Sequence, residues 1–200
     1  MRVIGLTGGI ACGKSTVSAV LREMGAVVID GDVLSRELTA PGGIALPAIR
    51  SRFGEGVFLP DGSLNRRALG AVIFGSDEAR EALDAIMQPM LRRMILEGIE
   101  AARASGAIIC VLDMPLLYEA GLEGLCDRVW CAWIPRETQL ERLMARDGFT
   151  REEAEARLRS QLPTAEKAAR ADVVIDTSGS IQYTRAMLPA LFDRELSPER

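Results

Sequence analysis

The sequence predicts an α/β fold in which helices cover a parallel sheet of five strands. Five short apolar runs, each the length of a buried strand, alternate with segments whose apolar residues recur at helical spacing. The first of these runs leads directly into a glycine-rich loop and a helix. Alternating strands and helices are typical of a parallel sheet, and 200 residues suffice for one domain with insertions.

The glycine-rich loop joins a strand over residues 2–6 to a helix over residues 15–24, and it matches the phosphate-binding pattern G-x-x-x-x-G-K-[ST]. Glycines let several backbone N–H groups point into one hollow, and the helix N-terminus adds partial positive charge. We expect Lys14 to reach the β- and γ-phosphates and the Ser15 hydroxyl to bind Mg²⁺. The candidate nucleotide contacts in the loop are Gly9, Ile10, Ala11, Cys12, Gly13, Lys14, Ser15 and Thr16.

Lysine usage supports a special role for the loop lysine. Of the 24 basic residues only Lys14 and Lys167 are lysines, and all the others are arginines. The compact ammonium group of lysine fits sites that the wider, planar guanidinium group of arginine does not fit. The alternative is a glycine turn with a chance lysine, which the flanking strand and helix argue against.

Composition excludes several classes of protein. The net charge of −4 argues against a nonspecific nucleic-acid binder, and no apolar run has the length of a membrane span. The absence of histidine removes histidine bases and metal ligands. The four cysteines show no C-x-x-C spacing, and no leader precedes the first strand, so we expect a reducing, cytoplasmic setting.

A second strand over residues 26–29 ends at two acids, Asp30 and Asp32. In open α/β sheets the ligands bind at the carboxyl ends of the strands, where the phosphate loop also lies. Asp32 has two interpretations. It accepts a proton from a substrate hydroxyl or helps to order Mg²⁺, or it caps the helix over residues 33–38.

The region 32–104 is expected to be a helical insertion beside the nucleotide site. Its clearest elements are a helix over residues 65–74 and a long helix over 77–105, with Ser76 as its cap. Pro89 lies inside the long helix, so we expect a kink or break after Gln88.

A third strand over residues 107–112 ends at Asp113, which either holds Mg²⁺ as a Walker-B-type acid or is a turn residue before Pro115. Residues 116–119 are expected to bridge to a helix. Tyr118 is expected to lie in the core or in a pocket wall rather than to act in catalysis.

A fourth strand over residues 129–134 precedes two helices, the second opened by a capping box at residues 150–153. Arginines in these helices are either solvated ion-pair partners or cations that a mobile helix pair brings to the γ-phosphate. The candidates for the second role are Arg142, Arg146 and Arg157. The tryptophans at 130 and 133 are expected to point to opposite faces.

The remaining chain completes the sheet. A short helix begins at Pro163, a fifth strand covers residues 173–176, and the loop 177–180 lies near the expected position of a nucleotide base. Asp176, at the end of this strand, is a further candidate nucleotide contact. The last helix covers residues 181–192, and residues 197–200 are expected to fray.

Taken together, these motifs resemble the dephospho-CoA kinase family over nearly the whole chain. The phosphate loop is shared with many nucleotide enzymes. The residues that distinguish this family best are Asp30 and Asp32 together with Pro115-Leu116-Leu117 and Glu119. The matching segments are 6–10 with 13–16, 29–32, 62–66, 113–119, 142–147, Arg157 with Gln161, and Lys167 with 171–176.

The resemblance implies a P-loop NTPase fold, a three-layer sandwich with a five-stranded parallel sheet, a helical substrate-binding insertion and a small helical lid. The implied boundaries are a core of 1–31, 105–136 and 171–194, an insertion of 32–104 and a lid of 137–170. The implied reaction moves the γ-phosphate of ATP to the 3′-hydroxyl of the ribose of dephospho-CoA, giving CoA and ADP.

The family pattern carries over to individual residues. Asp32 becomes the base or orienting acid, Lys14 and Arg142 stabilise the transferring phosphoryl group, Arg146 contacts the nucleotide and Ser15 serves Mg²⁺. ATP and dephospho-CoA are the implied partners, and we expect a monomer that contacts neither nucleic acid nor membrane. Two departures stand out: Gln88-Pro89 replaces the usual His-Pro, and Cys12 replaces a small hydroxyl residue.

Cys12 raises a hypothesis of its own. A thiol beside backbone N–H groups at a helix N-terminus can have a lowered pKa, and its oxidation would then block ATP. The alternative is a small residue that the loop tolerates. A Cys12→Ser variant that loses activity to peroxide as readily as the parent would refute the hypothesis.

Two other functions remain open from the residues alone. Another small-molecule or nucleoside monophosphate kinase would share loop, lid and core. A nucleotide-dependent switch would carry a guanine-specifying N-K-x-D, which the sequence lacks, and an acid at the acceptor side suits a hydroxyl nucleophile better.

Overall fold

The computed structural model describes residues 1–196; the four C-terminal residues, for which fraying was expected, lie outside the described part. The chain divides into two compact units, one made of Met1–Asp30 with Ile99–Arg200 and the other of Gly31–Gly98. The finer division into core, insertion and lid stays a prediction.

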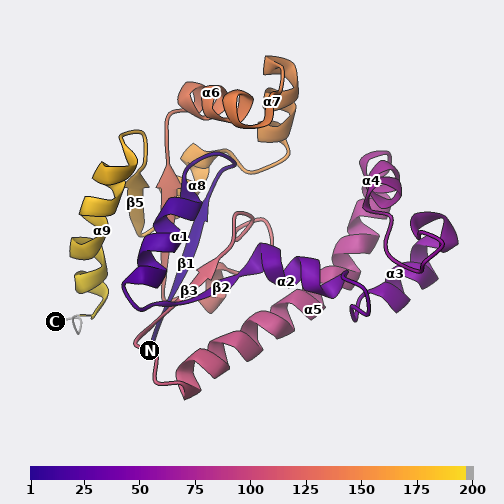
Figure 1. Cartoon of the computed structure of the whole chain (residues 1–200), viewed down its shortest axis with the longest axis horizontal. Helices are drawn as coiled ribbons and strands as arrows, with labels where there is room; N and C mark the ends of the chain where they lie inside the picture. Colours follow the sequence, from indigo (N-terminus) through magenta and orange to yellow (C-terminus); the bar gives the residue numbers. More distant parts are fainter. Residues whose placement is uncertain (197–200) are drawn as a thin grey trace. The chain divides into compact units, whose positions relative to one another are not determined.

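The first unit is built on the predicted sheet of five parallel strands, in the order β2-β3-β1-β4-β5 (Figure 1). The central strand β1 lies between β3 and β4, so the loop that follows it emerges from the middle of the carboxyl edge. The strands are β1 (Arg2–Gly8), β2 (Val27–Asp30), β3 (Ile109–Asp113), β4 (Arg128–Trp133) and β5 (Val173–Asp176).

Helices cover both faces of this sheet. On one face α1 (Lys14–Glu23) packs against α9 (Ile181–Leu196) over a core that includes Trp130. The helix α8 (Thr164–Arg170) packs against β4 and β1 and shares a pocket lining with Trp133, whose side chain points away from that of Trp130, so α8 covers the opposite face. Trp130 is fully buried in the first layer, whereas Trp133 lines a pocket beside α8, and the expected opposite orientation of the two indoles is confirmed.

Two short helices beyond β4 pack against the phosphate loop. Leu140 and Leu143 of α6 (Arg136–Asp147) and Ala154 of α7 (Arg151–Arg159) form a small apolar cluster with Ile10 and Ala11. The predicted capping box opens α7, with Thr150 and Glu153 each accepting a hydrogen bond from the other's backbone N–H. The loop is therefore covered by apolar contacts from segments distant in sequence.

The second unit is mainly helical. Ser76 caps a helix as the sequence predicted, by accepting a hydrogen bond from the N–H of Ala79. Asn65, which was expected to be the first residue of a helix, instead caps α4 and accepts from the N–H of Ala68. Its elements are α2 (Gly31–Leu38), α3 (Leu46–Phe53), the 3₁₀ turn η1 (Glu55–Val57), α4 (Arg66–Phe74) and most of α5 (Asp77–Ala104).

Several expectations were wrong. Of the kink or break expected after Gln88, the break is absent, because α5 is one continuous helix through Pro89, and an interior proline removes only one hydrogen bond from a long helix. Asp32 does not cap a helix, because α2 already begins at Gly31. Residues 116–119 lead through turns to the 3₁₀ turn η2 (Glu123–Leu125) rather than to an α-helix. The strand β2 is a partly exposed edge strand rather than a buried one, with Val27 37% exposed.

Within residues 1–196, no helix combines the length and the hydropathy needed to cross a bilayer.

Candidate nucleotide site

The backbone of the phosphate loop leaves a set of donors free. Within residues 1–196, four backbone N–H groups at or next to the start of α1 donate no hydrogen bond, those of Ala11, Gly13, Lys14 and Ser15. Ala11 adopts φ 62°, a left-handed conformation that costs energy for a residue with a Cβ atom. Strain of this kind persists where the surrounding structure requires it, and here it shapes a cradle of unpaired donors suited to an anion.

The lysine of the loop is held at the edge of this cradle. The Nζ atom of Lys14 forms an ion pair with the carboxylate of Asp113, which is 4% exposed. Asp113 ends β3, beside Leu6 of β1 on one side and Asp30 of β2 on the other. The sheet therefore brings two of the predicted acids to the same edge as the loop, and one of them already balances the lysine charge.

Both polar groups of the Ile10 peptide are fixed by glutamine side chains. The N–H of Ile10 donates to Gln161 Oε1 at 3.2 Å, and Gln139 Nε2 donates to the Ile10 carbonyl at 2.7 Å. The Thr164 hydroxyl donates to Gln139 Oε1 at 3.3 Å and so orients that amide. The sequence did not predict these roles of Gln139 and Thr164, because nothing in their local sequence distinguishes them from ordinary helix residues.

Contacts at Gly9 are tight. A Cβ atom built there would lie 2.1 Å from Thr164 Oγ1 and 2.5 Å from Gln139 Nε2. The loop needs glycine at this position because the Thr164 and Gln139 side chains approach its backbone closely, and not only because glycine has a flexible backbone.

A buried lysine joins α8 to the turn after β3. Lys167 is fully buried, forms an ion pair of 2.7 Å with Glu119 and donates to the Pro115 carbonyl at 2.6 Å. Glu119 Oε1 also accepts from the N–H of Leu162, next to Gln161. Pro115 follows Asp113 by two residues. The network therefore connects Asp113, which pairs with Lys14, with Gln161, which binds the N–H of Ile10. Lys167 and Glu119 appeared in the sequence only as parts of a family pattern, without a role.

A pocket of about 520 Å³ lies beside the loop. Arg142 and Arg146 line it, as two of the three candidate arginines, and the Arg142 guanidinium donates to the Ser178 carbonyl at 3.1 Å. Its lining comprises Ala11, Gly13, Ser15, Thr16, Arg142, Arg146, Thr177, Gly179, Ser180, Ile181 and Thr184. Loop, arginines and the segment 177–184 thus enclose a space that suits a phosphorylated ligand.

Other candidates lie elsewhere. Arg157 does not line this pocket but stacks on Phe149, with its guanidinium carbon 4.8 Å from the ring centroid. Asp176 accepts a bond of 2.8 Å from the Ser178 N–H, and this contact with Ser178 lowers the pKa of its carboxyl group. Asp176 therefore shapes the loop 177–180 rather than lining the pocket. Asp32 belongs to the second unit, so its relation to the loop stays a prediction.

The expectation of a lowered pKa at Cys12 was wrong. Its thiol is 1% exposed, and burial raises its pKa above the ordinary value. Hydrogen bonds, among them a contact of 3.7 Å to the Thr164 hydroxyl, act in the opposite direction but are outweighed. A buried thiol in its protonated form is a poor nucleophile, which removes the basis for the oxidation hypothesis.

Asp113 and Ser15 supply oxygen donors near the loop, but the described residues contain no group of three or more carboxylate, thiol or imidazole side chains able to hold a metal ion. A tight all-protein metal cage is absent from this part of the chain.

Comparison with known proteins gives consistent results. Residues 2–183 match the family model described as dephospho-CoA kinase. A dephospho-CoA kinase of Symbiobacterium thermophilum is 50% identical over 190 residues, covering 95% of this chain and 80% of the relative. Another, of Geobacter sulfurreducens, is 51% identical over 180 residues, with 90% and 91% covered.

Solved structures agree with this result. A dephospho-CoA kinase from Campylobacter jejuni superposes with a TM-score of 0.73 at 28% identity and covers 96% of each chain. A shikimate kinase from Acinetobacter baumannii, at 19% identity and a TM-score of 0.54, shares the fold alone.

Proposed function

The chain belongs to the dephospho-CoA kinase family, and from this premise we propose that it transfers the γ-phosphate of ATP to the 3′-hydroxyl of the ribose of dephospho-CoA, giving CoA and ADP. The observation that carries the proposal is the cradle of four unpaired backbone N–H groups beside Lys14. Phosphoryl transfer depends chiefly on positioning and on stabilising charge, and a cradle with a lysine beside it provides both.

Each residue near the loop has a role in this proposal. The free N–H groups hold the phosphates, and Lys14 exchanges its contact with Asp113 for the β- and γ-phosphate oxygens. Arg142 and Arg146, on a helix that packs on the loop, add positive charge where negative charge develops. Arg142 is the stronger candidate, because Arg146 is already paired with Asp147 at 2.8 Å.

Asp32 is proposed as the base that accepts the proton of the 3′-hydroxyl. It follows the end of β2 by two residues, and the β2 residue Asp30 is the register partner of Asp113. A carboxylate that removes the proton makes the hydroxyl oxygen a better nucleophile.

Magnesium fits the donors at the loop. Mg²⁺ commonly uses one or two protein oxygens together with substrate phosphates rather than a full protein cage, and the donors present match that pattern. Ser15, whose hydroxyl makes no hydrogen bond within residues 1–196, would hold it with Asp113. Bound there, the ion would neutralise charge on the phosphates. A cytoplasmic location and a monomeric state stay predictions from the sequence.

The test is ADP release in a coupled assay with ATP and Mg²⁺, with dephospho-CoA, AMP, CMP or adenosine as acceptor. We expect turnover with dephospho-CoA alone and a loss of kcat of about 10²–10⁴-fold in Asp32→Asn, with little change in the KM for ATP. The matched control is Asp84→Asn, the same change at an exposed position of α5.

If AMP or CMP is phosphorylated instead of dephospho-CoA, the proposed acceptor is wrong, but the proposed ATP site stands. An Asp32→Asn variant as active as Asp84→Asn would remove Asp32 from the mechanism.

A further inference from the structure

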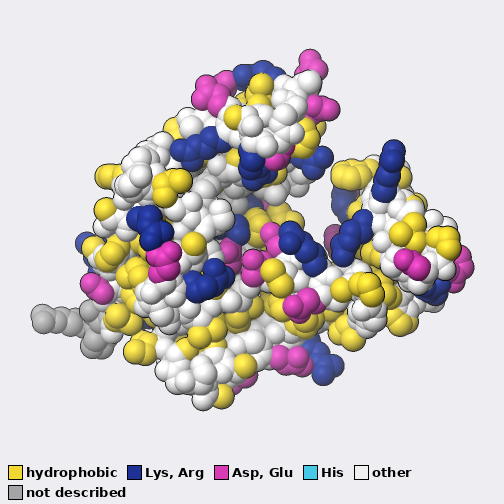
Figure 2. Space-filling view, viewed as in Figure 1, with side chains coloured by type: hydrophobic (Ala, Val, Ile, Leu, Met, Phe, Trp, Pro, Cys, Tyr) yellow, Lys and Arg dark blue, Asp and Glu magenta, His cyan; other side chains and the backbone are white. Residues whose placement is uncertain are grey.

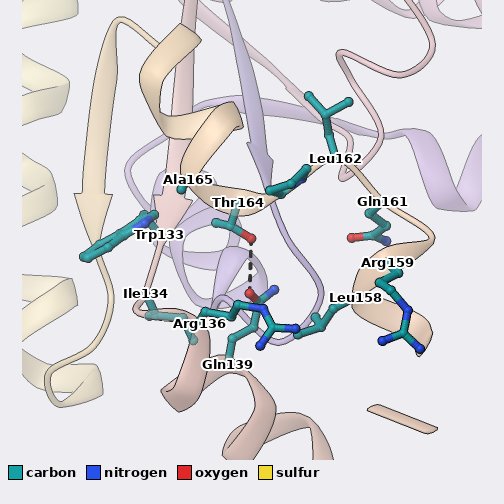
Figure 3. A pocket seen from close by; sticks show the side chains of 11 residues that line it. Trp133, Ile134, Arg136, Gln139, Leu158, Arg159, Gln161, Leu162, Thr164 and Ala165 are labelled. Carbon is teal, nitrogen blue, oxygen red and sulfur yellow. Dashed lines mark hydrogen bonds between the residues drawn. The ribbon is translucent and has the colours of Figure 1, made fainter. Parts of the chain in front are cut away.

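A second pocket, of about 360 Å³, lies between the end of β4 and the helices α6, α7 and α8 (Figure 3). We call it the α6–α8 pocket. It shares no lining residue with the nucleotide pocket. Its lining comprises Trp133, Ile134, Arg136, Gln139, Leu158, Arg159, Gln161, Leu162, Pro163, Thr164 and Ala165. Its volume is within the range of small-ligand sites.

The walls of the α6–α8 pocket define the class of ligand. Six of the lining residues are apolar, among them Trp133, Leu158 and Leu162, which offer a surface for a chain or a ring. The charged residues in the lining are Arg136 and Arg159, and no carboxylate lines the pocket. A pocket with apolar walls, in which arginines are the charged residues, suits a small ligand that joins an acidic group to an apolar chain or ring.

The two arginines differ in how far they are already neutralised. Arg159 lies 3.5 Å from Glu155 on its own helix. The guanidinium group of Arg136 makes no hydrogen bond or ion pair within residues 1–196, although its charge acts on the neighbouring Glu137. Glu137 is itself bound by Arg151, at 2.6 and 2.9 Å. Arg136 is therefore the stronger anchor for an acidic group.

Polar contacts link this pocket to the phosphate loop. Gln139 and Gln161, which hold the carbonyl and the N–H of Ile10, both line the α6–α8 pocket, as does Thr164, which orients Gln139 (Figure 3). A ligand that shifts either amide would change the hydrogen bonding of the Ile10 peptide, next to the free N–H of Ala11.

We propose that the α6–α8 pocket is a regulatory site for a small apolar anion, a carboxylate, sulfonate or phosphate joined to an apolar chain or ring, and that its occupancy changes the nucleotide affinity of the phosphate loop through Gln139 and Gln161. The regulatory part rests on the proposed nucleotide site. The binding part does not, and the two are measured separately.

Binding is tested by fluorescence titration with 8-anilinonaphthalene-1-sulfonate, an aromatic sulfonate, followed by displacement with octanoate. Arg136→Gln combined with Arg159→Gln lowers the affinity for the sulfonate about tenfold or more, because charge-assisted hydrogen bonds are lost. The matched control, Arg151→Gln combined with Arg93→Gln, removes the same charge outside the pocket and keeps the parent affinity. Ala165→Phe fills the pocket and abolishes binding.

Coupling is tested by equilibrium binding of ADP with and without saturating octanoate. The dissociation constant of ADP changes about fivefold or more and then reaches a plateau, and ADP changes the affinity for octanoate by the same factor. In Gln161→Leu, which cannot accept from the Ile10 N–H, octanoate still binds but the coupling falls.

Sulfonate affinity that is the same in the Arg136/Arg159 variant and in the control overturns the proposal. So does displacement by ADP without a plateau, since the probe would then lie in the nucleotide pocket. If the protein lacks kinase activity but keeps the binding and the coupling, the proposed function fails while this inference stands.

Discussion

The phosphate loop and the helices α6 and α7 are both rich in polar contacts, but the contacts differ in kind. Around the loop they are buried or partly buried and join residues more than 100 positions apart, such as Ile10 with Gln139 and Thr177 with Cys12. On the helices they are exposed and mostly local. Positive and negative side chains lie intermixed over that part of the surface, at the top of Figure 2.

The difference indicates where substitutions matter. A buried polar group that loses its partner keeps the cost of leaving water, whereas an exposed ion pair competes with water and salt and contributes little. Substitutions around the loop should therefore be costly, and those among the exposed pairs should be mild.

The largest effect is expected for Glu119→Gln, which leaves the fully buried Lys167 without its counter-charge. Breaking a buried ion pair by removing one partner is strongly destabilising, and we expect a loss of about 3 kcal/mol in the free energy of unfolding. Urea denaturation measures it. Glu97→Gln, which breaks an exposed pair with Arg93 on α5, is the control. Equal midpoints for the two variants would contradict the comparison.

The next effect is expected for Gly9→Ala, whose added methyl group meets Thr164 and Gln139. Overpacking should cost about 1–3 kcal/mol of stability, and the displaced Gln139 amide should weaken ADP binding. Calorimetric unfolding and ADP titration are the measurements. The control is Gly70→Ala, in α4, where an added Cβ meets no atom within 4 Å. A Gly9→Ala protein as stable and as tight for ADP as the control would show that the close approach is unimportant.

A small effect is expected for Arg151→Gln, although this arginine has a two-bond contact with Glu137 and a further pair with Glu155. Side chains this exposed gain little from pairing, so the midpoint of thermal unfolding should stay within error of the parent value, in low and in high salt. A clear salt-dependent fall in the midpoint would contradict this prediction, because it would show that the exposed ion pairs of α6 and α7 contribute to stability as the buried contacts do.

The smallest effect concerns the thiols at neutral pH. Burial raises the pKa of Cys110 to about 11 and that of Cys126 and Cys131 to about 12, from an ordinary 9.0, and Cys12 shifts in the same direction. We expect slow reaction of the folded protein with Ellman's reagent at pH 8 and rapid reaction of all four thiols in denaturant. Fast labelling of folded Cys12 would contradict its burial.

The same shifts have a defined sign in stability. Well below pH 9 both states keep the thiol protons. As the pH rises through 9 the unfolded chain loses them first, so the free energy of unfolding falls until the folded thiols ionise at a pH of about 11 to about 12. Urea midpoints at pH 8 and pH 10 measure this fall.

Much of the architecture could be predicted because its signals are local. The strand, loop and helix around Lys14, the capping box at Thr150 and the five strands were each visible in short windows of sequence. The break predicted at Pro89 is absent for a related reason. The rule that proline interrupts a helix considers only the residues next to it, and not the hydrogen bonds that hold the rest of α5.

The candidate site was predictable only in part. The sequence identified the loop and Arg142 with Arg146, but it also offered Arg157, which stacks on Phe149 instead. It suggested a lowered pKa for the Cys12 thiol, whereas burial, which the motif does not encode, raises that pKa.

The sequence by itself determined the local elements, namely the phosphate-binding loop, the alternation of strands and helices, and the caps. Only the tertiary structure decided which side chains hold the loop. The sheet order places β1 beside β4 and α8 over both strands, so Gln139 and Thr164 reach Gly9 and Ile10 although they are more than 125 residues away along the chain. Such contacts depend on the packing of whole elements, and no local pattern of residues encodes them.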